Sequence, residues 1–171
     1  RFLIQLSLLT EYCQQNKIDF LGDDFLKSNI EKLSSKLSFA ERRKLENQLL
    51  DNLKPEDITP LEYWTLIYQK KSNLQESVSR ILDIYYTKNW DKILDDDQQL
   101  KLYLKKSILF ARIGINGNLN YYIYKFLGNG SETIDILSKI KTDDTELQLQ
   151  INRAKKLCLE KFDYPIDDKK I

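Results

Sequence analysis

Apolar residues recur every three or four positions along most of this chain, which is the period of an amphipathic α-helix. The richest segment is 98–128, where one helix carries apolar residues on two roughly opposite faces. One face holds Leu100, Tyr103, Leu104, Phe110 and Ala111, and the other holds Leu102, Leu109 and Ile113. A helix that is apolar on two sides needs neighbours on two sides. We therefore expect this segment to lie inside the domain.

The same segment is predicted to form a helical hairpin that turns at residues 114–118. Gly114 and Gly117 follow a helix rather than a strand, so we interpret them as a left-handed helix end and not as a phosphate-binding loop. The second helix would bury Leu119, Tyr122, Ile123 and Phe126, and would leave Tyr121 and Tyr124 pointing elsewhere.

Other helix starts are marked by capping residues. Ser38 with Glu41, and Thr59 with Glu62, have the spacing of capping boxes, and Asp23-Asp24 is an acidic helix start. Apolar stripes of helical period also run through 2–15, 25–37, 74–85 and 147–162, and a short helix is expected at 134–140. No stretch shows sustained period-two alternation. These patterns predict an all-α fold of about eight or nine helices, packed as antiparallel hairpins in a bundle or a short right-handed stack.

Two predicted helical hairpins in the middle of the chain have similar turn sequences. Residues 72–74, Ser-Asn-Leu, and residues 117–119, Gly-Asn-Leu, occupy the same turn, each after an apolar and aromatic helix. In general style this resembles helical-repeat families such as the tetratricopeptide and half-a-tetratricopeptide repeats, and that resemblance implies a stack of hairpins. Those repeats place small residues at close helix contacts, whereas alanine occurs here only at Ala40, Ala111 and Ala154. A single irregular bundle therefore stays open.

Length and charge narrow the class of protein. A chain of 171 residues suits one domain, 1–171, with a polar tail at 163–171. Because it begins with Arg1 and lacks methionine, we expect it to be a segment of a larger protein. Its 27 Lys and Arg are interspersed with 26 Asp and Glu, so no global field attracts nucleic acid or a membrane surface. No apolar run is long enough to span a bilayer, and we expect no membrane partner.

The chemistry of the sequence argues against an enzyme. Histidine is absent, which removes the commonest general base and metal ligand, and two cysteines alone do not build a zinc site. We expect no catalytic residues, no cofactor and no metal. Carboxylates are the remaining option, and we interpret the run 95–97 as helix-capping charge. Catalysis would require two carboxylates, such as Asp96 with Asp97 or Glu41 with Glu46, to converge away from solvent.

Cys13 and Cys158 fall on the apolar sides of predicted helices, where we expect them to be buried and unpaired. Reduced thiols indicate an intracellular protein, nuclear or cytoplasmic. We interpret the basic run 42–44 as a solvated helix face, and Glu76 with Arg80 as an ion pair within one helix.

The best functional lead is a basic stripe between the two apolar faces of the first central helix. Lys106 lies near it, and the second helix adds two tyrosines and a lysine. The candidate partner-binding residues are Lys101, Lys105, Arg112, Tyr121, Tyr124 and Lys125. Our leading hypothesis is a protein–protein interaction domain that serves as a scaffold or adaptor. The alternative is a helical nucleic-acid-binding domain that uses Lys101, Lys105 and Arg112, and the partner and oligomeric state stay open.

Overall fold

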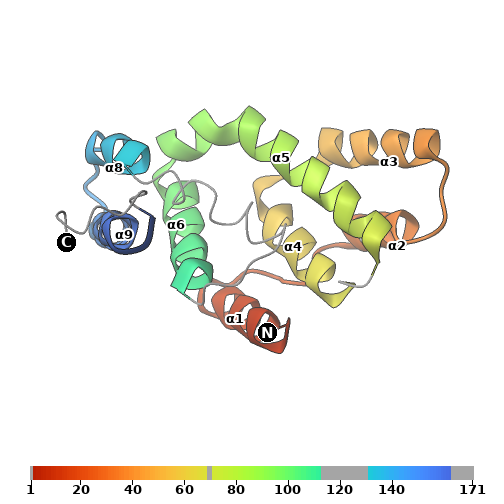
Figure 1. Cartoon of the computed structure of the whole chain (residues 1–171), viewed down its shortest axis with the longest axis horizontal. Coiled ribbons are helices and arrows are strands. Elements are labelled where there is room, and N and C mark those ends of the chain that lie inside the picture. Colours follow the sequence, from red (N-terminus) through yellow and green to blue (C-terminus); the bar gives the residue numbers. More distant parts are fainter. Residues whose placement is uncertain (1, 69–70, 113–130, 163–171) are drawn as a thin grey trace. The chain divides into compact units, whose positions relative to one another are not determined.

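The computed structural model describes residues 2–68, 71–112 and 131–162, and this part of the chain contains α-helices and no β-strand (Figure 1). Its eight α-helices are α1 (Phe2–Gln15), α2 (Asp24–Leu33), α3 (Phe39–Asn52), α4 (Ile58–Ile67), α5 (Ser72–Asp95), α6 (Asp97–Arg112), α8 (Ser131–Ser138) and α9 (Thr145–Leu157). The predicted all-α fold is confirmed. The predicted hairpin turn, its second helix and the polar tail lie outside the described residues.

Two of the predicted helix starts are confirmed in atomic detail. Asp23 is the N-cap of α2, and its Oδ1 accepts a hydrogen bond from the Leu26 amide at 2.8 Å. At α3, the Ser38 hydroxyl accepts from the Glu41 amide at 3.2 Å, and the Glu41 carboxylate accepts from the Ser38 amide at 3.1 Å. Both caps satisfy backbone donors that a helix end otherwise leaves free.

The capping box predicted at Thr59 is wrong. A 3-10 turn, η1 (Pro55–Asp57), leads directly into α4, which begins at Ile58, so Thr59 lies inside the helix. The stabilising side-chain contact lies before Thr59, in the turn that precedes α4, where Asp57 Oδ2 accepts a hydrogen bond from the Lys54 amide at 2.8 Å. Proline at the start of the turn favours this earlier nucleation, because its φ is already helical.

The helices gather into two compact units, residues 1–89 and 90–171, and the boundary falls within α5. In the first unit α1 packs on α4, and α2 packs on both α3 and α4. Its fully buried apolar side chains are Leu9, Cys13, Leu26, Ile30, Leu33, Leu49, Leu61, Leu74, Val78, Ile81 and Leu82. Most of these residues lie on the predicted apolar stripes, so helical periodicity located much of this core. Leu49 on α3 and Leu61 on α4 lie outside those stripes.

One interpretation of surface charge in the first unit is wrong, and a second holds only in part. Glu76 and Arg80 do not pair within α5; Glu76 Oε2 lies 3.3 Å from Arg42 Nη2, and Arg80 Nη1 lies 3.0 Å from Glu46 Oε1. The Arg42 side chain is only 20% exposed, so the basic run is not simply solvated. The reason is that α3 lies beside α5, and contacts between helices replaced the local pair.

In the second unit α6 and α8 both pack on α9. The predicted stripe is confirmed at Leu147, Ile151 and Ala154 of α9 and at Cys158, the C-cap that follows it, since all four are buried; the Phe162 side chain lies outside the described residues. On α6, Leu100, Tyr103 and Leu104 are buried as predicted, whereas Leu102 and Leu109 on the second face are half-buried. Both cysteines, Cys13 and Cys158, are buried as expected, and they form no disulfide bond with each other. Across the described ranges, no helix combines the length and apolar character needed to cross a bilayer.

Candidate functional site

The basic stripe of α6 faces the acidic start of α9. Lys101 Nζ lies 2.9 Å from Asp144 Oδ2 and 3.5 Å from Glu146 Oε2, and Lys105 Nζ forms an ion pair with Glu146 Oε1. The Lys101 side chain is only 12% exposed. We call these four residues the α6–α9 seam. The remaining candidates, the Arg112 side chain and residues Tyr121, Tyr124 and Lys125, lie outside the described residues.

Asp144 does two jobs with its two oxygens. Its Oδ1 caps α9 by accepting from the Glu146 amide at 3.0 Å and the Leu147 amide at 3.1 Å. Its Oδ2 accepts the hydrogen bond from Lys101 on α6. The N-terminus of a helix favours negative charge, so the cap and the ion pair reinforce each other. The residue that starts α9 therefore also attaches it to α6.

The seam changes the acidity of its members. The hydrogen bond from Lys101, together with those from backbone amides, holds the pKa of Asp144 below its usual value. The hydrogen bond from Lys105 lowers the pKa of Glu146 in the same way. Reciprocally, the bond to Asp144 raises the pKa of Lys101. All these shifts favour the charged forms at neutral pH, so within the seam the positive charges of Lys101 and Lys105 are balanced by two carboxylates.

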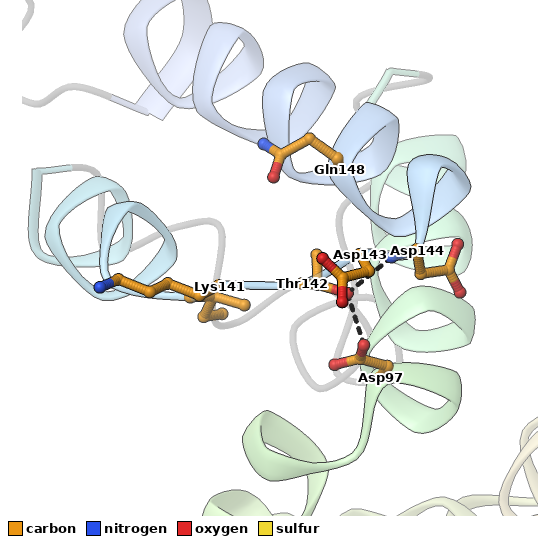
Figure 2. Close-up of a pocket in the computed structure, with 7 residues that line it drawn as sticks. Asp97, Lys141, Thr142, Asp143, Asp144 and Gln148 are labelled. Carbon is orange, nitrogen blue, oxygen red and sulfur yellow. Dashed lines mark hydrogen bonds between the residues drawn. The ribbon is translucent and has the colours of Figure 1, made fainter.

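A pocket of about 630 Å³ adjoins the seam (Figure 2). It is lined by Asp97, Ile140, Lys141, Thr142, Asp143, Asp144 and Gln148. In its wall, the Thr142 hydroxyl donates to Asp97 Oδ2 at the start of α6 and accepts from the Asp144 amide at 3.1 Å. The loop between α8 and α9 is thus tied to α6 at two points, Asp97 and Lys101.

Three polar residues of this pocket, Asp97, Thr142 and Asp144, make contacts that hold the helices together. Asp97 and Asp144 are occupied by Thr142, Lys101 and the amides of α9, and Asp143 is exposed. In the part of the chain that the structure describes, no three Asp, Glu or Cys residues are grouped to hold a metal ion. As arranged, the pocket supplies hydrogen-bonding and charged groups to solvent, without an activated nucleophile and base.

The two carboxylate pairs considered for catalysis do not converge in a shielded site. Asp96 caps α6, accepting from the Gln98 amide at 3.0 Å and from the Gln99 amide at 3.2 Å, and Asp97 is solvent-exposed beside it. Glu41 caps α3 at the surface, whereas the Glu46 side chain is 4% exposed and faces α5. The absence of enzymatic activity stays a prediction.

Sequence reasoning found Lys101 and Lys105 and missed the groups that cover them. Nothing in the spacing indicated that the start of α9, with Asp144 and Glu146, would lie against α6. Lys106, also near the predicted stripe, is buried at 4% exposure. The role of Lys101 and Lys105 in binding a partner remains a prediction. A partner that binds these two lysines must compete with Asp144 and Glu146. Comparisons with known protein families, with curated proteins and with solved structures found no match.

Proposed function

We propose that this chain is a non-enzymatic helical domain that binds other proteins, as a scaffold or adaptor segment of a larger intracellular protein. The main support comes from the α6–α9 seam. Nucleic-acid binding draws its affinity from basic groups that replace the counterions of phosphates. Lys101 and Lys105 already have carboxylate partners within the chain, so they are poorly placed for that work.

Exposed apolar side chains also support a protein-binding function. Leu3 and Ile4 of α1 are 73% and 53% exposed, and Phe39 at the start of α3 is 67% exposed. Single exposed apolar residues are common on any protein, whereas a cluster with arginine is the composition of a protein interface. Phe39 combines an exposed ring with an arginine, since the Arg43 guanidinium carbon lies 4.8 Å from the centre of that ring.

The proposal is tested by capturing partners on the immobilised full chain from a nuclease-treated cell extract. We expect a protein that is retained at physiological salt and is then reconstituted with the chain from purified components. Recovery of chaperones alone, from extracts of every growth condition tried, would contradict the proposal.

The nucleic-acid alternative is tested by titrating the chain with labelled single- and double-stranded RNA and DNA from low to physiological salt. We expect no tight binding even at low salt. Affinity that falls steeply with added salt, and that weakens in Lys101→Gln, would favour the alternative instead.

Charge reversal of the stripe is a poor test of either function. Glu in place of Lys101 or Lys105 would face Asp144 and Glu146, and the like charges would loosen the second unit. Neutral glutamine is the better substitution, because it removes the charge while keeping most of the side chain's length.

A further inference from the structure

The first turns of α3 carry an exposed aromatic ring paired with an arginine. Phe39 is the first residue of the helix, and the Arg43 guanidinium carbon lies 4.8 Å from the centre of its ring. Phe39, Arg43 and Glu46 recur at i, i+4 and i+7, so they form one stripe along α3. The stripe meets α5 at Glu46, which bonds to residues of that helix, whereas Phe39 at its other end is 67% exposed.

A buried carboxylate organises the arginines around this stripe. Glu46 Oε2 accepts a hydrogen bond from Ser77 Oγ at 2.7 Å, and Oε1 accepts from Arg80 Nη1 at 3.0 Å. Arg42 Nε and Arg43 Nε lie farther away, 3.9 Å and 3.8 Å from the same carboxylate. A buried charge needs such partners to offset its desolvation. One glutamate therefore holds three guanidinium groups close together at the surface.

The ion-paired groups of this surface carry one more positive charge than negative charge. Its three arginines face two carboxylates, Glu46 and Glu76, and Glu46 is almost fully covered. The Arg43 side chain is 38% exposed, and its Nε lies 3.8 Å from Glu46 Oε1, which is longer than a hydrogen bond, so a ligand in solvent can reach this guanidinium group. Lys44 and Glu41 do not alter this balance, because they lie about 140° and 200° around α3 from Phe39.

We propose that Phe39, Arg42, Arg43 and Arg80, together the α3 platform, dock an acidic segment of a partner protein. Carboxylates of the partner pair with the guanidinium groups, and a large apolar side chain packs against the Phe39 ring. Arginine and aromatic residues are the usual anchors of protein interfaces, and arginine matches carboxylates with two parallel hydrogen bonds. This inference rests on the proposed protein-binding function and names its surface.

A nucleic-acid strand fits the α3 platform less well. Its phosphates repeat along the chain, and tight binding needs several basic contacts in a row. The platform has a surplus of one charge, and the exposed carboxylate of Glu76 lies within it. An acidic protein segment can instead place one or two carboxylates at the arginines and keep the rest away from Glu76.

The test is a selection of random 16-residue peptides displayed on phage against the immobilised full chain. The enriched peptides should be net acidic and contain a large apolar residue. Synthetic fluorescein-labelled versions should bind about tenfold more weakly to Phe39→Ser and to Arg43→Gln. The matched controls are Lys44→Gln, which removes a charge from the far side of α3, and Leu3→Ser, which removes another exposed apolar residue; both should bind as the wild type does.

Several outcomes would overturn the α3 platform: no enrichment, enrichment without acidic bias, or undiminished binding to Phe39→Ser and Arg43→Gln. Competition by single-stranded RNA that depends on Phe39 would assign the surface to nucleic acid instead. If Phe39→Ser lowers the melting temperature, the binding of peptides to Arg43→Gln and Arg43→Lys tests the platform instead. Lysine keeps the charge but loses the paired hydrogen bonds of arginine, so both variants should bind more weakly than the wild type. A captured protein partner that binds all these variants as tightly as the wild type would refute the α3 platform. The proposed protein-binding function would not be affected by that result.

Discussion

Lys17 is a lysine in a position that favours glycine. Its φ is +56°, and it follows α1 in a left-handed helix end where the Ile18 amide donates to the Cys13 carbonyl at 2.8 Å. A side chain in this conformation costs about 1 kcal/mol, which glycine avoids. We predict that Lys17→Gly raises the free energy of unfolding by up to about 1 kcal/mol, measured by urea denaturation. Lys17→Val should lower it, and an equal effect of both variants would contradict the prediction.

Gly22 presents the opposite case. Its φ is +73°, and a Cβ added there would lie 2.7 Å from Leu26 Cδ2 and 3.2 Å from Pro60 Cβ. The Leu26 methyl can move, but the proline ring has little freedom. We predict that Gly22→Ala lowers the free energy of unfolding by about 1–3 kcal/mol, with an unchanged urea m-value. An unchanged denaturation midpoint would show that the loop adapts.

Residue-scale features were predictable from the sequence where the cause is local. Ser38 with Glu41 satisfies its own helix end within four residues, and the structure has that capping box. The same spacing at Thr59 failed, because an earlier turn at Pro55 had already started the helix. Spacing alone does not reveal which of two overlapping starts the chain uses.

At the scale of helices, the α6–α9 seam should make stability depend on acidity. The folded pKa of Asp144 is lowered, so its contribution is full above the unfolded value of about 4 and is lost as the pH falls through the folded value. Asp144→Asn keeps an N-cap oxygen but removes the charge that pairs with Lys101. We predict that this variant loses less stability than the wild type between about pH 5 and pH 2.

Urea midpoints measured at several pH values over this range check that prediction. Asp143→Asn is the matched control, because the neighbouring carboxylate is exposed and has no ion pair within the described residues. The control should follow the wild-type curve. Identical acid profiles for Asp144→Asn and the wild type would mean that the ion pair with Lys101 does not contribute.

The partners of the basic stripe could not be predicted for a physical reason. Helical periodicity fixes which residues share a face of one helix, and it placed Lys101 and Lys105 together. It carries no information on which distant segment covers that face. The hydrogen bond between Lys101 and Asp144 spans 43 residues and depends on how α6 and α9 pack. The same limit applies to Arg80, whose partner lies on α3 rather than one turn away.

At the scale of the whole molecule, the chain offers one tryptophan in each unit, Trp64 and Trp90. Helix α5 contributes buried residues to both units, with Leu74 and Ile81 in the first and Ile93 in the second. A shared helix links their unfolding, so we predict one cooperative transition, as expected of a single domain. The all-α class was readable from periodicity; the division within α5 was not, because its apolar pattern continues across the boundary.

Single-tryptophan variants test this prediction. Trp64→Phe leaves fluorescence from the second unit, and Trp90→Phe leaves fluorescence from the first. In urea, each variant's fluorescence transition should coincide with its own far-ultraviolet circular dichroism transition. A fluorescence midpoint displaced from the dichroism midpoint would show that the two units are independently folding domains.

The central claim is that this chain binds protein and does so without nucleic acid. The most direct measurement is isothermal titration of the purified, nuclease-treated chain with the purified protein that it captures from extract. We predict saturable binding with a defined stoichiometry at physiological salt, with no nucleic acid present. Binding that appears only when RNA or DNA is added, or the absence of any protein that binds directly, would contradict the claim.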